Sequence, residues 1–247
     1  WPAASEAFLV DGEVPPIGHV IKLPDLVVVL ERVGAEGPEV FYEGDIARQL
    51  VAGVREAGGI WTLEDMAAYE VVEREPIRTT YKGYELVTAS PPSSGGVAIA
   101  QMLNILDPWP LTKMDRPQRA HLIVEAMRRA YRDRAIYLGD PDFAEVPVER
   151  LTSSHYAAGL RAGIHPSRAT PSAMLPGNAM PWESEDTTHF SVLDADGNMV
   201  AATLTVNLAF GNRFMVPGTG FVLNNEMDDF SAKEGVPNAF GLIGFEA

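Results

Sequence analysis

The chain has 247 residues, of which 46% are hydrophobic and 21% charged, as in an ordinary globular protein. Its net charge of −15 argues against nucleic acid or an anionic membrane as a partner, because both repel an acidic surface. It has no cysteine, which excludes disulfides, thiol catalysis and cysteine-ligated zinc, and no apolar run approaches the roughly 20 residues of a membrane span.

The first part of the chain is predicted to be mainly helical. An Asp-Gly pair predicts a short hairpin over residues 7–14. Residues 23–33 are apolar at helical spacing and are predicted to form a helix, although their run of valines would also suit a strand. An amphipathic helix is predicted over residues 44–57. Thr62 and Asp65 have the spacing of a capping box that opens a further helix.

The middle of the chain combines a predicted hairpin with three predicted helices. Two strands are expected over residues 76–88, around a Lys-Gly turn, and helices over 97–106, 117–138 and 152–163. In the longest of these helices we expect five residues to face the core: Leu122, Met127, Ala130, Tyr131 and Tyr137.

Four arginines crowd the later half of that long helix. Cations near a helix C-terminus interact favourably with the helix dipole, and we interpret the cluster in this structural sense rather than as a ligand site. The four are Arg128, Arg129, Arg132 and Arg134.

Residues 164–186 are rich in Pro, Gly, Ser and Ala and show no periodicity, which is typical of an accessible surface linker that could be cut. Alternation around an Asp-Gly turn then predicts a β-hairpin over residues 190–206, and further strands are expected at 214–216 and 220–223. Helices followed by a strand-rich section indicate an α+β fold.

Thr187 stands where the linker feeds the first strand of that hairpin. If the bond from Asp186 to Thr187 were cut, Thr187 would carry a free α-amine beside its own hydroxyl. Such an amine has a pKa of about 7.7–8.0, which suits a general base for the hydroxyl nucleophile. Spacing alone favours a plain strand residue, since Thr is a good strand former.

The chain resembles the γ-glutamyltranspeptidase family along its whole length and in order. The upstream segments that carry the likeness are Pro91-Pro92-Ser93-Ser94-Gly95-Gly96 and Tyr137-Leu138-Gly139-Asp140-Pro141-Asp142-Phe143. The downstream segments are Thr187-Thr188-His189-Phe190-Ser191-Val192, Asp196-Gly197-Asn198, Thr203-Leu204-Thr205-Val206-Asn207 and Leu223-Asn224-Asn225-Glu226-Met227-Asp228-Asp229-Phe230-Ser231.

This resemblance implies part of a four-layer αββα sandwich of the N-terminal nucleophile hydrolase type, incomplete at both ends. It implies autocatalytic cleavage between Asp186 and Thr187. Residues 1–186 would then be the C-terminal part of a large subunit, ending in the cleavable linker, and residues 187–247 the N-terminal part of a small subunit. Thr187 would transfer a γ-glutamyl group from glutathione or a related compound to water, an amino acid or a peptide.

The resemblance also implies roles for four residues downstream of the nucleophile. Thr205 would contact Thr187 and assist cleavage, whereas we interpret Thr203 as structural. Asn207, Glu226 and Asp229 would hold the α-amino and α-carboxylate region of the substrate, and carboxylates and an amide oxygen can accept charge-assisted hydrogen bonds from its ammonium. Glu and Gln both occur at position 226 in the family.

Several other motifs are interpreted without chemistry. His189 has no second histidine at ligand spacing, so we predict no zinc, and no cofactor is expected. Residues 194–198 imitate a calcium loop but lack its later Gly and Glu, so we expect a hairpin turn. Phe240 lies in the stretch that resembles the family's lid, where Tyr is frequent; without a hydroxyl, a looser lid and relatively more hydrolysis are expected.

Two alternatives remain open. A related cephalosporin or glutaryl acylase would use the same threonine with a differently lined pocket, and a homologue that does not cleave would be inert. The family's carboxylate-binding arginine would precede Trp1, and its serine pair and oxyanion glycines would follow Ala247, so we expect this chain alone to be inactive. Residence in the periplasm or medium is expected by resemblance only.

Overall fold

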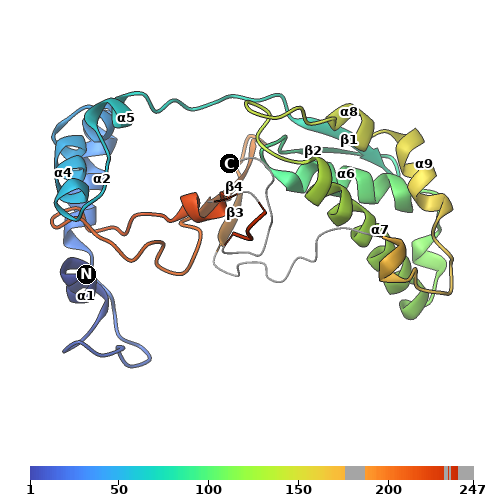
Figure 1. Cartoon of the computed structure of the whole chain (residues 1–247), viewed down its shortest axis with the longest axis horizontal. Helices are drawn as coiled ribbons and strands as arrows, with labels where there is room; N and C mark the ends of the chain where they lie inside the picture. The colour runs from blue at the N-terminus through green and yellow to red at the C-terminus, as the bar shows by residue number, and fades with distance from the viewer. Residues whose placement is uncertain (176–186, 231–232, 234, 239–247) are drawn as a thin grey trace. The chain divides into compact units, whose positions relative to one another are not determined.

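A computed structural model of the chain describes residues 1–175, 187–230, 233 and 235–238 (Figure 1). Asp186 and Phe240, the expected cleavage partner and lid residue, lie outside the described residues. The chain forms two compact units: residues 1–71 with 180–247, and residues 72–179. In the described residues, no helix is long and apolar enough to cross a membrane.

The helices of the first unit come from its N-terminal part. They are α1 (Pro2–Phe8), α2 (Pro24–Glu36), α3 (Glu39–Tyr42), α4 (Asp45–Glu56) and α5 (Leu63–Ala67). The predicted capping box is confirmed, with Thr62 Oγ1 accepting from the Asp65 N–H at 3.1 Å and an Asp65 carboxylate oxygen accepting from the Thr62 N–H at 2.8 Å. The expected hairpin over residues 7–14 is wrong in part. Helix α1 occupies the start, and only the bridge between Val10 and Glu13 remains.

The core of this unit combines residues from far apart in the sequence. Leu50 and Val54 of α4 pack with Val216 and Leu223. Gly53 permits the approach, since a Cβ there would lie 2.6 Å from Val216 Cγ1. Residues before the linker and residues after Thr187 therefore share one hydrophobic core.

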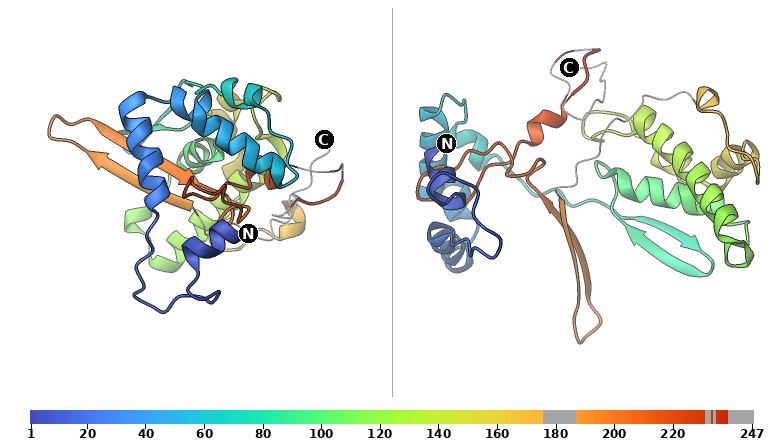
Figure 2. Two further views of the ribbon diagram at one scale, coloured as in Figure 1. Left: turned by 90° about the vertical axis from the view of Figure 1, so that its left-hand side faces the viewer. Right: turned by 90° about the horizontal axis from the view of Figure 1, so that it is seen from below.

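The expected hairpin forms from β3 (Thr187–Leu193) and β4 (Met199–Thr205), which pair antiparallel (right-hand view of Figure 2). Its turn is closed by the Asp194 carboxylate, which accepts from the backbone N–H of Asn198 at 2.8 Å. The further strands expected at 214–216 and 220–223 do not form, and only the bridge between Met215 and Val222 is present. Gly218 and Gly220 have positive φ and turn the chain back, and Val216 packs with residues of α2 and α4 instead.

The second unit contains the other predicted hairpin and the longest helix. Its elements are β1 (Ile77–Tyr81), β2 (Tyr84–Thr88), α6 (Ser94–Leu106), η1 (Leu111–Lys113), α7 (Arg116–Tyr137), α8 (Val148–Leu151), α9 (Ser154–Ala162) and η2 (Ser172–Met174). Strands β1 and β2 pair antiparallel. The mixture of helices and antiparallel pairs confirms an α+β fragment, while the stacking of layers in the expected sandwich stays a prediction.

The buried face of α7 differs from the prediction. Leu122 and Ala130 are buried as expected, but Met127 is 40% exposed. Glu125 and Arg129, one helical turn apart, are buried instead. Their charges can be buried because they pair, with Arg129 Nη1 2.7 Å from a Glu125 carboxylate oxygen. Arg129 therefore acts through an ion pair in the core, and of the four arginines predicted to interact with the helix dipole only Arg134 lies in the last turn of α7.

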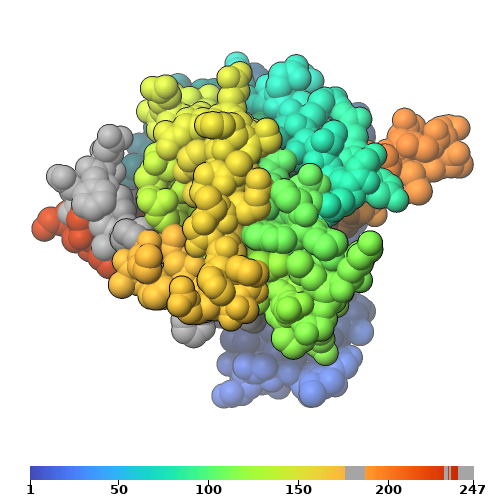
Figure 3. Space-filling model, turned by 90° about the vertical axis from the view of Figure 1, so that its right-hand side faces the viewer, coloured from blue at the N-terminus to red at the C-terminus, as the bar shows by residue number. Residues whose placement is uncertain are grey.

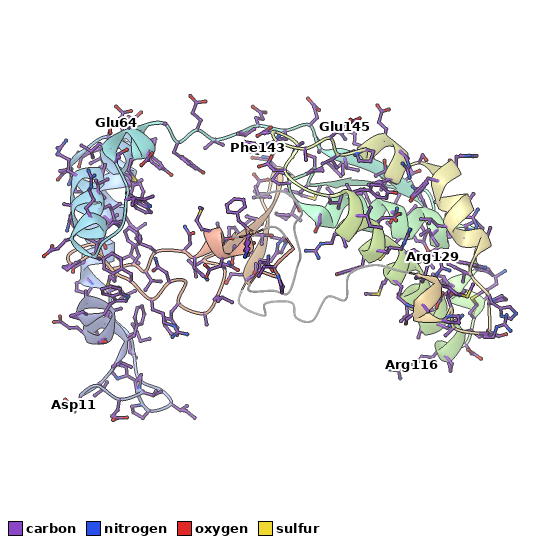
Figure 4. The ribbon with its side chains drawn as sticks, in the orientation of Figure 1. Asp11, Glu64, Arg116, Arg129, Phe143 and Glu145 are labelled. Atoms are coloured by element: carbon purple, nitrogen blue, oxygen red, sulfur yellow. The ribbon has the colours of Figure 1, made fainter. Side chains whose placement is uncertain are left out.

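The segment after α9 is docked on α7 at its start. Ile164 is buried in the core formed by α6, α7 and α9. Glu125 accepts from the Thr170 N–H at 3.1 Å and from Thr170 Oγ1 at 2.5 Å, and Arg129 donates to the carbonyl of Gly163 at 2.9 Å. Figure 3 shows the gold atoms of this segment lying against the rest of the unit, and Figure 4 labels Arg129 close to it. The first residues of the expected linker are therefore packed.

Candidate active site

Thr187 and Thr205 face each other across the β3–β4 hairpin. They are paired in the ladder, and Thr187 Oγ1 lies 3.5 Å from Thr205 Oγ1, at the limit of a hydrogen bond. The pairing follows from the turn, because a two-residue period on each strand keeps facing residues on one side of the sheet. The two hydroxyls expected to cooperate are thus neighbours.

Thr205 also connects this pair to the residue expected to bind substrate. Its Oγ1 accepts from the backbone N–H of Asn207 at 2.9 Å. Asn207 is 6% exposed and has a φ of +74°, a left-handed conformation that asparagine tolerates better than most residues. The chain turns sharply there, which directs the Asn207 side chain toward the segment that carries Glu226 and Asp229.

The amide of Asn207 holds that acidic segment. Its Nδ2 donates to the carbonyl of Asn225 at 2.9 Å and to Asp229 Oδ1 at 3.0 Å. Glu226 and Asp229 are the ends of η3 (Glu226–Asp229), a single tight turn. The structure therefore brings together all three residues predicted to receive the substrate's amino group.

Glu226 has an unsatisfied carboxylate oxygen. Its Oε1 is shielded from solvent and has no hydrogen-bond partner among the described residues. Burial raises the pKa of Glu226, and the negative charge of Asp229 raises it further. A shielded acceptor beside a second carboxylate could receive a cation, because an ammonium would satisfy the oxygen and relieve the repulsion.

Two residues interpreted as structural lie on the same face as the nucleophile. His189 follows Thr187 by two positions and pairs with Thr203, and His189 Nδ1 lies 2.8 Å from Thr203 Oγ1. This hydrogen bond holds the imidazole against the opposite strand, as expected if both residues have a structural role.

Asn225 is a residue of the site that the sequence reasoning missed. Its N–H donates to the carbonyl of Val206 at 3.2 Å, its Oδ1 accepts from the N–H of Leu208 at 3.0 Å, and its Nδ2 donates to Asp228 at 2.8 Å. It therefore fastens the end of β4 to the acidic turn. The only signal in the sequence was an asparagine pair directly before the acidic residues.

Comparisons with known proteins match this chain to one family. The family model described as Gamma-glutamyltranspeptidase matches residues 1–246. The glutathione hydrolase proenzyme of Escherichia coli (strain K12) is 44% identical over 243 residues, which are 97% of this chain and 42% of that protein. The acylase ACY 1 proenzyme of Pseudomonas sp. (strain SE83) is 39% identical over 237 residues, 95% of this chain and 42% of that protein. The chain thus spans about two-fifths of the length of these relatives.

Solved structures give the same result. The γ-glutamyltranspeptidase of Helicobacter pylori matches with a TM-score of 0.68 and 33% identity, covering 72% of this chain and 52% of that chain. The cephalosporin acylase of Bacillus halodurans matches with a TM-score of 0.79 and 28% identity, covering 93% of this chain and 41% of that chain. Because the family model covers nearly every residue, the chain belongs to the γ-glutamyltranspeptidase family.

Proposed function

We propose that the protein containing this chain cleaves itself before Thr187 and then uses Thr187 to transfer γ-glutamyl groups from glutathione or related compounds to water or to an amine. The observation that carries the proposal is the continuous set of contacts from Thr187 through Thr205 and Asn207 to Asp229. It links a candidate nucleophile to a candidate ammonium receptor within one unit.

The first step is an N-to-O acyl shift. The Thr187 hydroxyl attacks the carbonyl carbon of Asp186, its proton passes to the departing Thr187 nitrogen, and an ester replaces the peptide bond. Water then hydrolyses the ester, which leaves a carboxylate on Asp186 and a free amine on Thr187. Thr205, 3.5 Å from the attacking oxygen, positions that oxygen for the step.

The mature reaction repeats the same attack on a substrate. The freed α-amine takes the proton of the Thr187 hydroxyl as its oxygen attacks the γ-carbonyl, and the substrate's amine departs with a proton. Water or an amino acid then attacks the γ-glutamyl ester and restores the hydroxyl. Each oxyanion donor in such a reaction typically contributes about 10²–10³ in rate.

The acidic receptor selects the substrate. A γ-glutamyl group carries an α-ammonium, which Glu226 and Asp229 would hold by charge-assisted hydrogen bonds. A plain dicarboxylate such as a glutaryl group has no ammonium and would meet like charge there. The receptor therefore favours a γ-glutamyl donor over the acylase alternative.

The two products of cleavage would stay together. Val216 and Leu223, from the second piece, are buried against helices of the first, and Gln49 Nε2 donates to the carbonyl of Pro217 at 2.7 Å. Separating the pieces would expose this core to water. We accordingly propose a heterodimer of large and small subunits. From the family resemblance we also propose that the protein resides in the periplasm or the medium, and fractionation of cells that express the full-length protein would test this location.

Gel electrophoresis and N-terminal sequencing of the full-length protein test the proposal. We expect two bands, with the smaller piece beginning at Thr187, and hydrolysis of a γ-glutamyl anilide by the cleaved protein. The Thr187→Ala variant should show one band and no hydrolysis. Normal turnover by that variant, or a lasting single band in the wild type, would refute the proposal. Preference for a glutaryl over a γ-glutamyl anilide would support the acylase instead.

A further inference from the structure

The loop that follows Asn207 is held in an unfavourable backbone conformation. Five non-glycine residues in the described part of the chain have positive φ, and three of them fall between 207 and 213. Asparagine tolerates this region, but Phe210 and Arg213, each with a φ of +62°, are residue types that rarely adopt it. Such conformations persist only where the surroundings impose them, and they concentrate at binding sites.

The segment that leads to η3 helps to impose this conformation. The N–H of Asn212 donates to the carbonyl of Leu223 at 3.0 Å, and the N–H of Leu208 donates to Asn225 Oδ1 at 3.0 Å. Gly211 allows the two segments to touch, since a Cβ there would lie 2.2 Å from the carbonyl oxygen of Leu223. Hydrogen bonds and close backbone contact therefore hold the strained loop against the segment that leads to Glu226 and Asp229.

The remaining support comes from helix α1. The ring of Phe8 packs edge-to-face on the ring of Phe210, with centroids 5.1 Å apart at 68°. Trp1 packs in the same manner on Phe214, with centroids 4.9 Å apart at 76°. Helix α1 has seven residues, none of them buried, and Phe8 at its end attaches it to this loop through the ring contact.

We propose that α1 positions the substrate receptor: Phe8, by packing on Phe210, holds the loop in the conformation that presents Asn207 to Glu226 and Asp229. Phe8 and Phe210 are positioning residues for substrate affinity. Their contact acts on the loop that carries Asn207 and the acidic turn, so we expect it to govern substrate binding more than the chemical step. This inference rests on the proposed function for the identity of the ligand, but not for the effect on the loop.

Steady-state kinetics of the full-length enzyme with a γ-glutamyl anilide test the proposal. We expect Phe8→Ala and Phe210→Ala each to raise KM about tenfold with kcat within about twofold, the size of effect that loss of one aromatic contact produces. Cleavage before Thr187 should stay complete. The double variant should match either single variant, because both remove the same contact. Phe143→Ala, at a ring that is 89% exposed in the other unit, is the matched control and should change nothing.

Hydrogen exchange provides a readout that needs no turnover. The N–H groups of Leu208 and Asn225 should exchange about tenfold faster in the Phe8→Ala variant, because the loop would separate more often from the segment that leads to Glu226. If that variant fails to fold, Phe8→Leu keeps an apolar side chain and should give a smaller change in the same direction. Unchanged KM and unchanged exchange in a folded Phe8 variant would overturn the proposal. If the wild type does not turn over the anilide but exchange is still faster in the Phe8 variant, the proposed function is refuted and the positioning role of Phe8 stands.

Discussion

Two glutamates, one in each unit, have carboxylate oxygens shielded from solvent, but their pKa values are shifted in opposite directions. Glu125 of α7 accepts from Arg129 Nη1 at 2.7 Å, from Arg128 Nη1 at 2.8 Å and from both the N–H and the hydroxyl of Thr170. Burial alone would raise the pKa of Glu125, but the hydrogen bonds from Thr170 and Arg129 outweigh it and lower the pKa to about 2. Its charge is fully satisfied by the protein.

Glu226 has the reverse surroundings. Its shielded Oε1 lacks a donor among the described residues, and burial followed by the charge of Asp229 raises its pKa. A buried carboxylate that the protein satisfies is a structural element, whereas one left unsatisfied beside another carboxylate is prepared for a ligand. The difference places Glu125 in the fold and supports the proposal that Glu226 binds the substrate's ammonium.

Replacing Glu125 should have the largest effect on stability. Glu125→Ala leaves the buried Arg129 guanidinium without its carboxylate, and breaking such a pair typically costs about 3–5 kcal/mol. We expect the free energy of unfolding in urea to fall by that amount in the full-length protein. Glu149→Ala, at an exposed glutamate of α8, is the control. A loss below about 1 kcal/mol would show that the ion pair does not stabilise this unit.

Replacing Glu226 should affect binding and spare stability. Glu226→Ala removes an acceptor for the substrate ammonium, and a hydrogen bond to a charged group contributes about 1.5–3 kcal/mol. KM for a γ-glutamyl anilide should therefore rise by roughly 10- to 100-fold. The melting temperature should not fall, because no protein partner of Oε1 is lost. A clear drop in melting temperature with unchanged KM would make Glu226 structural like Glu125.

The two carboxylates should also lose their charge in different pH ranges, because their pKa values are shifted in opposite directions. The pKa of Glu125 is lowered from 4.5 in the folded state, so its stabilisation is present above pH 4.5 and is lost as pH falls toward 2. The pKa of Glu226 is raised, so its charged form, and with it substrate affinity, should increase as pH rises through that pKa. Glu226→Gln keeps an acceptor oxygen and should flatten the dependence of KM on pH. A dependence that survives in this variant would assign it to another group.

The smallest expected effect concerns the docked segment. Thr170→Val removes one hydroxyl bond to Glu125 and should lower the free energy of unfolding by about 1 kcal/mol. Thr80→Val, at an exposed position of β1, should change it by less than about 0.5 kcal/mol. Equal effects of the two substitutions would show that the hydroxyl bond to Glu125 contributes nothing.

Local patterns sufficed for much of the fold and of the candidate site. Helix α4, the capping box at Thr62 and the hairpin register that pairs Thr187 with Thr205 all depend on residues a few positions apart or on one turn. They did not suffice for the buried face of α7. The contact that buries Glu125 is with Thr170, 45 positions away, and no periodicity encodes such a pair.

The sequence by itself determined which residues could act: a threonine after a linker, and an asparagine and two carboxylates placed where one family places them. Only the tertiary structure decided how each carboxylate behaves. A glutamate is the same acid in any sequence, and its charge becomes either a satisfied part of the core or an open receptor according to the donors that distant segments bring within hydrogen-bond distance.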